Sequence, residues 1–201
     1  FAIPALSAGC FLRALPDATT PDIQASLALY SVENIGGALH PFSGLTGVAT
    51  LLRPESAGYL RIRSRDPREA PAIHPNYLSA QKDRDTLVAG LRALRRILQA
   101  PALAQQLVEE VEPGLECASD DELADYARRR GSTVYHPVST CRMGVDERAV
   151  VDARLRVRGL AGLRVIDASI MPTLVSGNTN AATIMIAEKG ADLVLEDACA
   201  A

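Results

Sequence analysis

The chain lacks long apolar runs and any excess of positive charge, and each absence excludes a class of protein. Its longest apolar stretches fall far short of the roughly 20 residues that a membrane-spanning helix requires, so we expect no span. Lys and Arg number 21 against 24 Asp and Glu, and no basic run is longer than residues 128–130, which argues against nucleic acid as the main partner. With 201 residues, 48% of them hydrophobic, the chain is long enough to fold around a core.

Cysteine pairs and nucleotide-binding signatures are absent as well. The four cysteines, Cys10, Cys117, Cys141 and Cys199, form no CxxC pair, so we expect no metal site, no disulfide framework, and reduced thiols in a cytoplasmic protein. The chain contains no GxGxxG, P-loop or GxSxG, the motifs that hold a dinucleotide, a nucleotide phosphate or a nucleophilic serine. It begins with Phe1 rather than Met, which indicates a processed or truncated product.

Three helices are predicted from periodicity and caps. Leucines at spacings of four, three and four, opposite arginines, predict an amphipathic helix over about 83–99. Ser119 followed by Glu122 fits a capping box and predicts a second helix that ends near Gly131. A third helix is predicted over about 181–196, and because its residues are apolar on every side we expect it to be buried.

Short β-rich runs predict strands between these helices. The runs 48–52 and 58–63 flank a turn-forming segment and predict a hairpin, and the prolines of 71–75 predict an extended stretch. After Gly144, the runs near 150–151, 155–157 and 163–166 predict strands in tight succession. The irregular mixture of strands and helices predicts an α+β fold with a mixed or antiparallel sheet rather than a regular βαβ series.

One of the three histidines, His136, is a candidate catalytic residue. His40 and His74 lack the companions that a catalytic site requires, whereas His136 lies in the polar loop 132–144, which neither helix nor strand explains. A neutral imidazole can accept a proton from an alcohol but cannot remove a hydride, so alcohol oxidation would also need an organic acceptor. A purely structural interpretation stays open, with Tyr135 and Met143 in a core.

A second polar group precedes the last predicted helix. Asp167-Ala168-Ser169 follows a predicted strand, and the polar segment 176–180 opens the helix. A helix N-terminus can receive a carbonyl, a phosphate or a reduced ring anion. The alternative is that Asn178 or Thr179 is an ordinary N-cap.

Three motifs resemble the carboxy-terminal signature of the glucose-methanol-choline (GMC) oxidoreductases. They are YHPVSTCRMG at 135–144, LRVIDASIMP at 163–172 and NTNAATIMIAEK at 178–189, in the order that the family has them. Upstream, residues 21–24, 52–56 and 66–67 resemble the substrate-binding region of the same family. The resemblance therefore runs nearly from end to end.

The resemblance implies an FAD-dependent oxidation of an alcohol. It implies that the flavin N5 takes the hydride while His136 accepts the hydroxyl proton, with Asn180 as its partner, as in the choline dehydrogenase-like branch. Asp167 and Ala168 would lie against the ribityl and pyrophosphate, and Asn180 and Ala181 near the pyrimidine edge. The positive end of a helix there would stabilise the charge of a reduced flavin.

The resemblance also divides the chain and leaves it incomplete. Residues 1–150 would form a substrate-binding domain, and 151–201 would complete an FAD-binding domain whose Rossmann-type amino-terminal part is missing from these 201 residues. We therefore expect that the chain requires a complementing amino-terminal segment and that apolar faces are left exposed without it. The resemblance also implies a small primary alcohol as substrate. Dehydrogenase chemistry is favoured over oxidase chemistry by the resemblance alone. The rival interpretation is a non-catalytic binding or assembly module, a homo-oligomer that forms through the exposed surface.

Overall fold

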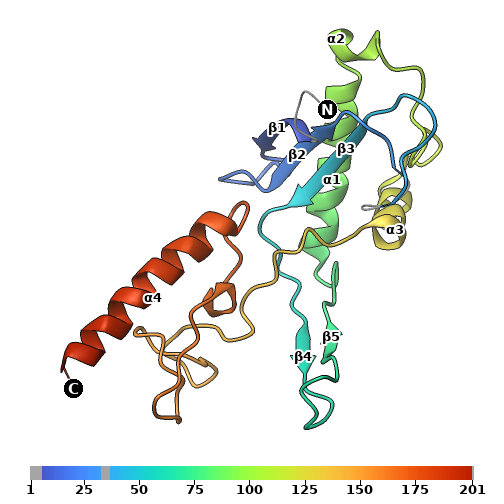
Figure 1. Cartoon of the computed structure of the whole chain (residues 1–201). Coiled ribbons are helices and arrows are strands. Elements are labelled where there is room, and N and C mark those ends of the chain that lie inside the picture. The colour runs from blue at the N-terminus through green and yellow to red at the C-terminus, as the bar shows by residue number, and fades with distance from the viewer. Residues whose placement is uncertain (1–5, 33–36, 201) are drawn as a thin grey trace. The chain divides into compact units, whose positions relative to one another are not determined.

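The computed structural model describes residues 6–32 and 37–200, which form two compact units (Figure 1). One unit comprises Phe1–Ala57 and Asn76–Val134, and the other comprises Gly58–Pro75 and Tyr135–Ala201. These divisions lie away from residue 150. The predicted division at 150 concerns assembly within a longer protein, and it stays a prediction.

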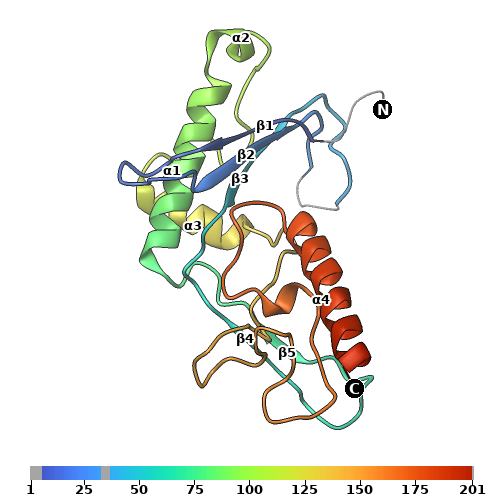
Figure 2. The ribbon, with the colours of Figure 1, turned by 90° about the vertical axis from the view of Figure 1, so that its left-hand side faces the viewer.

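A three-stranded antiparallel sheet and one long helix make the core of the first unit (Figure 2). The strands β1 (Leu6–Leu12), β2 (Ile23–Ala28) and β3 (Thr46–Leu51) lie in that order, and α1 (Gln81–Leu98) packs on β2 and β3. A Cβ on Gly90 would come within 2.8 Å of Ile23 Cδ1, and one on Gly47 within 2.8 Å of Leu94 Cδ2. Glycine at these two positions therefore lets the helix lie close to the sheet.

The helix α1 confirms the prediction from the leucine periodicity, and a buried carboxylate ties it to the chain before it. Asp83 is only 1% exposed. Its Oδ1 accepts a hydrogen bond from Glu55 N and its Oδ2 accepts one from Ser56 N, both at 2.8 Å. The segment that follows β3 is thereby fixed to the first turn of α1.

The predicted capping box is present in α3 (Asp120–Arg130). Ser119 Oγ accepts from Glu122 N at 3.2 Å, while Glu122 Oε2 accepts from Ser119 N at 2.8 Å. Between α1 and α3, the short helix α2 (Pro101–Ala104) leads into a loop that Arg95 of α1 holds through Glu110, at 2.6 Å. Local signals therefore predicted both long helices of this unit.

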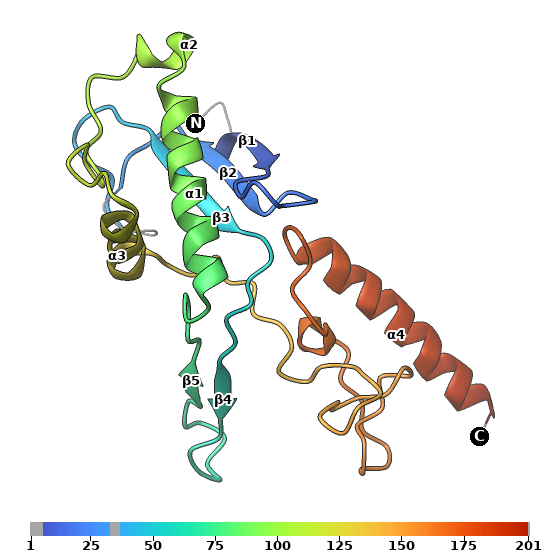
Figure 3. The same cartoon turned by 180° about the vertical axis from the view of Figure 1, so that it is seen from behind.

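The predicted hairpin between 48–52 and 58–63 is wrong. The strand β3 pairs with β2, and β4 (Tyr59–Arg61) pairs with β5 (Ala72–His74) in the second unit (Figure 3). The segment 54–57 does not fold back because Asp83 takes up the N–H groups of Glu55 and Ser56. The extended stretch predicted at 71–75 is confirmed by β5.

The rest of the second unit is built from turns and a long helix. Its core consists of buried side chains from the 151–171 turns and the helix, namely Val151, Leu155, Ile170, Met171, Ile186 and Leu193. The strands predicted near 150–151, 155–157 and 163–166 are wrong, because the structure has only isolated bridges there, such as Val151 with Val157. Positive φ angles of 78° at Gly159 and 74° at Gly162 turn the chain too tightly for regular strands.

The last helix, α4 (Asn180–Ala200), begins where it was predicted, but its expected burial on every side is wrong. Ile186 is 7% exposed, whereas Ile184 and Met185 are 54% and 59% exposed. One face of α4 packs on the core of turns, and Ile184 and Met185 on the other face are exposed.

Among residues 6–32 and 37–200, no helix combines the length and the apolar character that crossing a membrane requires. All four cysteines carry free thiols. The cytoplasmic location expected from the sequence stays a prediction.

Candidate functional site

His136 lies in a loop that is fastened to a short 3-10 helix, η1 (Ala168–Ile170). Ser139 Oγ donates to Met171 O at 2.8 Å, Cys141 N donates to Ser169 O at 3.0 Å, and Met143 N donates to Ile170 O at 2.8 Å. Residues 139–143, the second half of the loop, are thus held by η1 and by Met171, which follows it.

The backbone of this loop is strained on both sides of the imidazole. Tyr135 has φ of 59° and Ser139 has φ of 73°, in the left-handed region that residues other than glycine seldom adopt. Strain of this kind persists where the surrounding contacts fix the chain, and it is concentrated at functional sites. The hydrogen bond from Ser139 Oγ to Met171 O is such a contact.

Two side chains from the start of α4 meet the imidazole. Asn178 Nδ2 lies 3.1 Å from His136 Nε2, and Thr179 Oγ1 lies 3.2 Å from His136 Nδ1. Asn178 is exposed, His136 is half-buried and Thr179 is buried. Both ring nitrogens therefore have hydrogen-bond partners, one on the open side of the ring and one on the buried side.

The expected catalytic pair of His136 and Asn180 stays a prediction, and the hydrogen bonds of the His136 ring are those to Asn178 and Thr179. No hydrogen bond joins these two residues in the described part of the chain, and Asn180 is the exposed first residue of α4. The helix starts with the bond from Thr183 N to Thr179 O, so Asn178 and Thr179 precede its first turn and reach the loop. The sequence contains two candidate amides around Thr179, and nothing in the sequence alone fixes which one faces the ring.

The other predicted site residues lie on η1 and on the first turn of α4, two elements that contact each other. Asp167 caps η1, because its Oδ1 accepts from Ser169 N at 2.7 Å and from Ser169 Oγ at 2.5 Å. Ala168 packs at the edge of the buried core. Ala181 lies exposed beside Asn180.

An ion pair closes the end of the same loop. Arg142 Nη1 donates to Asp146 Oδ2 at 2.9 Å and Arg142 Nη2 donates to Asp146 Oδ1 at 2.5 Å, while Arg148 N donates to Oδ1 at 3.0 Å. These hydrogen bonds, that of Arg142 first, lower the pKa of Asp146 to about 2.

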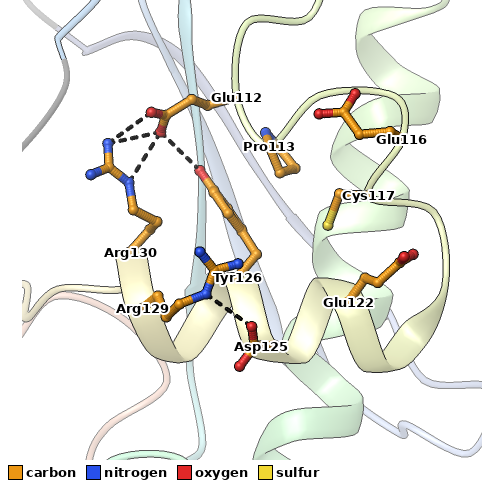
Figure 4. Close-up of a pocket in the computed structure, with 9 residues that line it drawn as sticks. All are labelled: Glu112, Pro113, Glu116, Cys117, Glu122, Asp125, Tyr126, Arg129 and Arg130. Carbon is orange, nitrogen blue, oxygen red and sulfur yellow. Dashed lines mark hydrogen bonds and ion pairs between the residues drawn. The ribbon is translucent and has the colours of Figure 1, made fainter.

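The first unit contains a groove of about 380 Å³ beside α3 (Figure 4). Four of its charged side chains form ion pairs, Glu112 with Arg130 and Asp125 with Arg129, both at 2.9 Å. Burial, followed by the neighbouring charge of Glu112, raises the pKa of Tyr126. None of the predicted site residues lines this groove, so the arrangement around His136 is the better candidate site.

No cluster of three or more metal-binding side chains occurs in the described residues. What the arrangement around His136 offers is a proton acceptor. A neutral imidazole held on both nitrogens can take a proton from a hydroxyl at one of them.

Sequence comparison relates the chain to known oxidoreductases. A family model described as GMC oxidoreductase matches residues 54–187. The chain is 43% identical over 187 residues to an oxygen-dependent choline dehydrogenase of Escherichia coli O45:K1 (strain S88 / ExPEC), a match that covers 93% of this chain and 33% of the relative. It is also 43% identical to an alcohol dehydrogenase [acceptor] of Pseudomonas putida, with 93% and 34% covered.

Comparison with solved structures also relates the chain to an oxidoreductase. The pyridoxine 4-oxidase from Mesorbium loti superposes with a TM-score of 0.85 at 32% identity, over 94% of this chain and 37% of that one. The chain thus spans about a third of the length of the curated relatives that it matches.

Proposed function

The chain belongs to the GMC oxidoreductase family, and from this membership we propose that it is the carboxy-terminal part of an FAD-dependent enzyme that oxidises an alcohol. The observation that carries the proposal is the His136 imidazole, held by Asn178 and Thr179 where two of the family-like motifs meet. FAD, when bound, supplies the acceptor for the hydride. The protein's own task is then to take the hydroxyl proton and to orient the alcohol.

His136 is the proposed proton acceptor. Its Nε2 faces Asn178, which is exposed, so a hydroxyl can approach this nitrogen from the open side. We keep Asn180 as the proposed catalytic partner of His136 and add Asn178 as a second amide at the ring, because its Nδ2 lies 3.1 Å from Nε2. An amide beside the ring can hold the alcohol oxygen in place while the proton moves to Nε2.

The residues of η1 and α4 are compatible with a flavin. The first N–H groups of an α-helix have no acceptor within the helix, and the first two residues of α4, Asn180 and Ala181, are exposed. That end of the helix favours a negative charge, which a reduced flavin carries. We propose that Asp167, Ala168, Asn180 and Ala181 hold FAD, with Asp167 oriented by Ser169.

The open face of α4 supports the proposed completion of an FAD-binding domain by residues 151–201. Ile184 and Met185 are more than half exposed, although apolar residues of this size are usually covered in a folded protein. An amino-terminal segment that carries the rest of that domain would cover them. Residues 1–150 would then serve the substrate.

The proposed substrate is a small primary alcohol. The relatives are named for choline, for an alcohol and for pyridoxine, each of which carries a CH–OH group. A proton acceptor such as His136 suits the oxidation of all three. Dehydrogenase rather than oxidase chemistry is proposed from the relatives alone.

The test compares the 201-residue chain with the same chain joined to the segment encoded upstream of it. We expect the joined protein to retain FAD, seen by its visible absorbance, and to oxidise primary alcohols. His136→Asn should then lower kcat/KM by about 10²–10⁴-fold, the usual contribution of a general base, with FAD retained.

The matched control is His74→Asn, which changes a histidine that stacks on Tyr59 and should leave activity intact. A joined protein that ignores FAD would favour the rival function, a non-catalytic binding or assembly module. Full activity of His136→Asn with FAD retained would remove His136 from the proposed role.

A further inference from the structure

We infer that Thr179 is a positioning residue that accepts the proton of neutral His136 on Nδ1, so that Nε2 stays the acceptor, first of the Asn178 amide and then, once that amide turns away, of the substrate proton. This inference rests on the proposed function for its use in catalysis. It concerns a hydroxyl group that the resemblance did not assign to the site.

The donors and acceptors around the ring lead to this tautomer. An amide nitrogen donates hydrogen bonds and does not accept them, so Asn178 Nδ2, 3.1 Å from Nε2, makes Nε2 the acceptor. A neutral imidazole has one donor and one acceptor, which leaves the proton on Nδ1. Thr179 Oγ1, 3.2 Å away, accepts it.

Burial of Thr179 stabilises its hydrogen bond with His136 Nδ1. Thr179 is 9% exposed and is one of the few buried polar residues in the described chain. A hydroxyl that loses water must find a hydrogen-bond partner inside the protein or cost stability. Within residues 6–32 and 37–200, the hydroxyl of Thr179 forms its hydrogen bond with His136 Nδ1.

The backbone of Thr179 has a separate task, which distinguishes its side chain from an ordinary helix cap. Its carbonyl accepts from Thr183 N at 2.9 Å and from Thr183 Oγ1 at 2.8 Å, and so starts α4. An N-cap side chain usually accepts from the backbone of the first turn. Here the hydroxyl turns instead to the imidazole.

The arrangement suits both charge states of the ring. When Nε2 takes the alcohol proton, both ring nitrogens become donors, and the bond from Nδ1 to Thr179 Oγ1 stays as it was. Only the exposed side has to change, because the Asn178 amide must then present its oxygen or withdraw. Thr179 therefore holds the ring in one orientation throughout the proton transfer.

The tautomer can be read directly by long-range ¹H–¹⁵N NMR on the 201-residue chain, at a pH where free histidine is neutral. The chain has only three histidines, and His136→Gln identifies the signals of His136. We expect a protonated Nδ1 and a bare Nε2. Thr179→Val, which removes the acceptor of the Nδ1 proton but leaves Asn178 donating to Nε2, should shift the ring part of the way toward the tautomer mixture of free histidine, and Thr179→Ser should restore the wild-type pattern.

His40 and His74 are internal controls, since their signals should stay constant in every variant that folds. A wild-type ring with the proton on Nε2 would overturn the inference, and so would a Thr179→Val spectrum unchanged from wild type. Should Thr179→Val disturb the signals of His40 or His74, Thr179→Ala gives the same comparison with a smaller side chain, and the wild-type spectrum still decides.

This readout needs neither flavin nor turnover, so a failure of the proposed alcohol oxidation would leave the tautomer result standing. In the flavin-loaded joined protein, Thr179→Val should lower kcat by about 10-fold, a fraction of the about 10²–10⁴-fold that a general base supplies. KM for the alcohol should stay nearly constant, and Thr179→Ser should recover kcat. A loss confined to KM would contradict a positioning role.

Discussion

Asp146 ends the loop that carries His136, and its titration reports whether that loop is closed. The hydrogen bonds from Arg142 lower its pKa from 3.8 to about 2. A carboxylate with a lowered folded-state pKa stabilises the fold fully above its unfolded pKa, and this contribution is lost as the pH falls through the folded pKa. We therefore expect the Arg142–Asp146 contact to persist down to about pH 4 and to be lost toward about pH 2.

Carboxyl ¹³C NMR over that range checks the prediction. In Arg142→Leu the pKa of Asp146 should return toward 3.8, because the first cause of the shift is gone. The control is Asp66, whose pKa is lowered by Arg68 elsewhere in the chain and should not respond. An ordinary titration of Asp146 in the wild-type chain would contradict the geometry.

A candidate site residue was predictable from the sequence where its residue type is rare in the chain. His136 stood out because it is one of three histidines and lies among polar residues in a loop. The amide that hydrogen-bonds to its ring was not predictable, since Asn178 and Asn180 are two residues apart and the start of α4 decides which one lies beside Nε2. The role of Thr179 depends on the same register, and a buried hydroxyl has no signature in a sequence.

At the scale of elements, the capping box of α3 allows a quantitative prediction. Ser119→Ala removes the acceptor of Glu122 N and should lower stability by about 1 kcal/mol. The donors of Ser119 also lower the pKa of Glu122, so the capping box should weaken in acid as Glu122 becomes protonated.

Urea denaturation followed by far-UV circular dichroism measures this loss. Ser132→Ala changes an exposed serine just after the same helix and should alter stability by no more than about 0.5 kcal/mol. Equal losses in the two variants would show that the cap contributes nothing specific.

Elements with local signals were predictable and elements with distant partners were not. The helices α1 and α3 follow from periodicity and a cap, which need only neighbouring residues. The hairpin prediction failed because each of its two runs pairs with another segment, β3 with β2 and β4 with β5. The runs of the 151–166 segment contain strand-forming residues, yet Gly159 and Gly162 bend it into turns.

At the scale of the molecule, α4 has one face that is packed and one that is open. Its hydrophobic residues lie on every side, and this even distribution is typical of a helix that is enclosed in a complete protein. Among the described residues of α4, the large apolar side chains that are buried are Ile186 and Leu193. The exposure of apolar surface that the family resemblance predicts agrees with the 54% and 59% exposure of Ile184 and Met185.

Two isoleucines separated by one residue test this asymmetry. Ile186→Ser places a hydroxyl in the core of the second unit and should lower stability by about 2–4 kcal/mol. Ile184→Ser changes a side chain that is already 54% exposed, so the stability of the 201-residue chain should change by no more than about 0.5 kcal/mol. The same change should reduce binding of an apolar dye and any self-association through this face.

The difference between the stability losses of Ile184→Ser and Ile186→Ser should shrink once the upstream segment is joined to the chain. If that segment covers the open face of α4, Ile184→Ser becomes a core substitution and should then destabilise the protein and weaken its retention of FAD. Thermal denaturation of both forms, each with Ile184→Ser and Ile186→Ser, makes the comparison. An Ile184→Ser variant that is equally harmless in both forms would show that the face stays open, and it would then favour an assembly role for this surface.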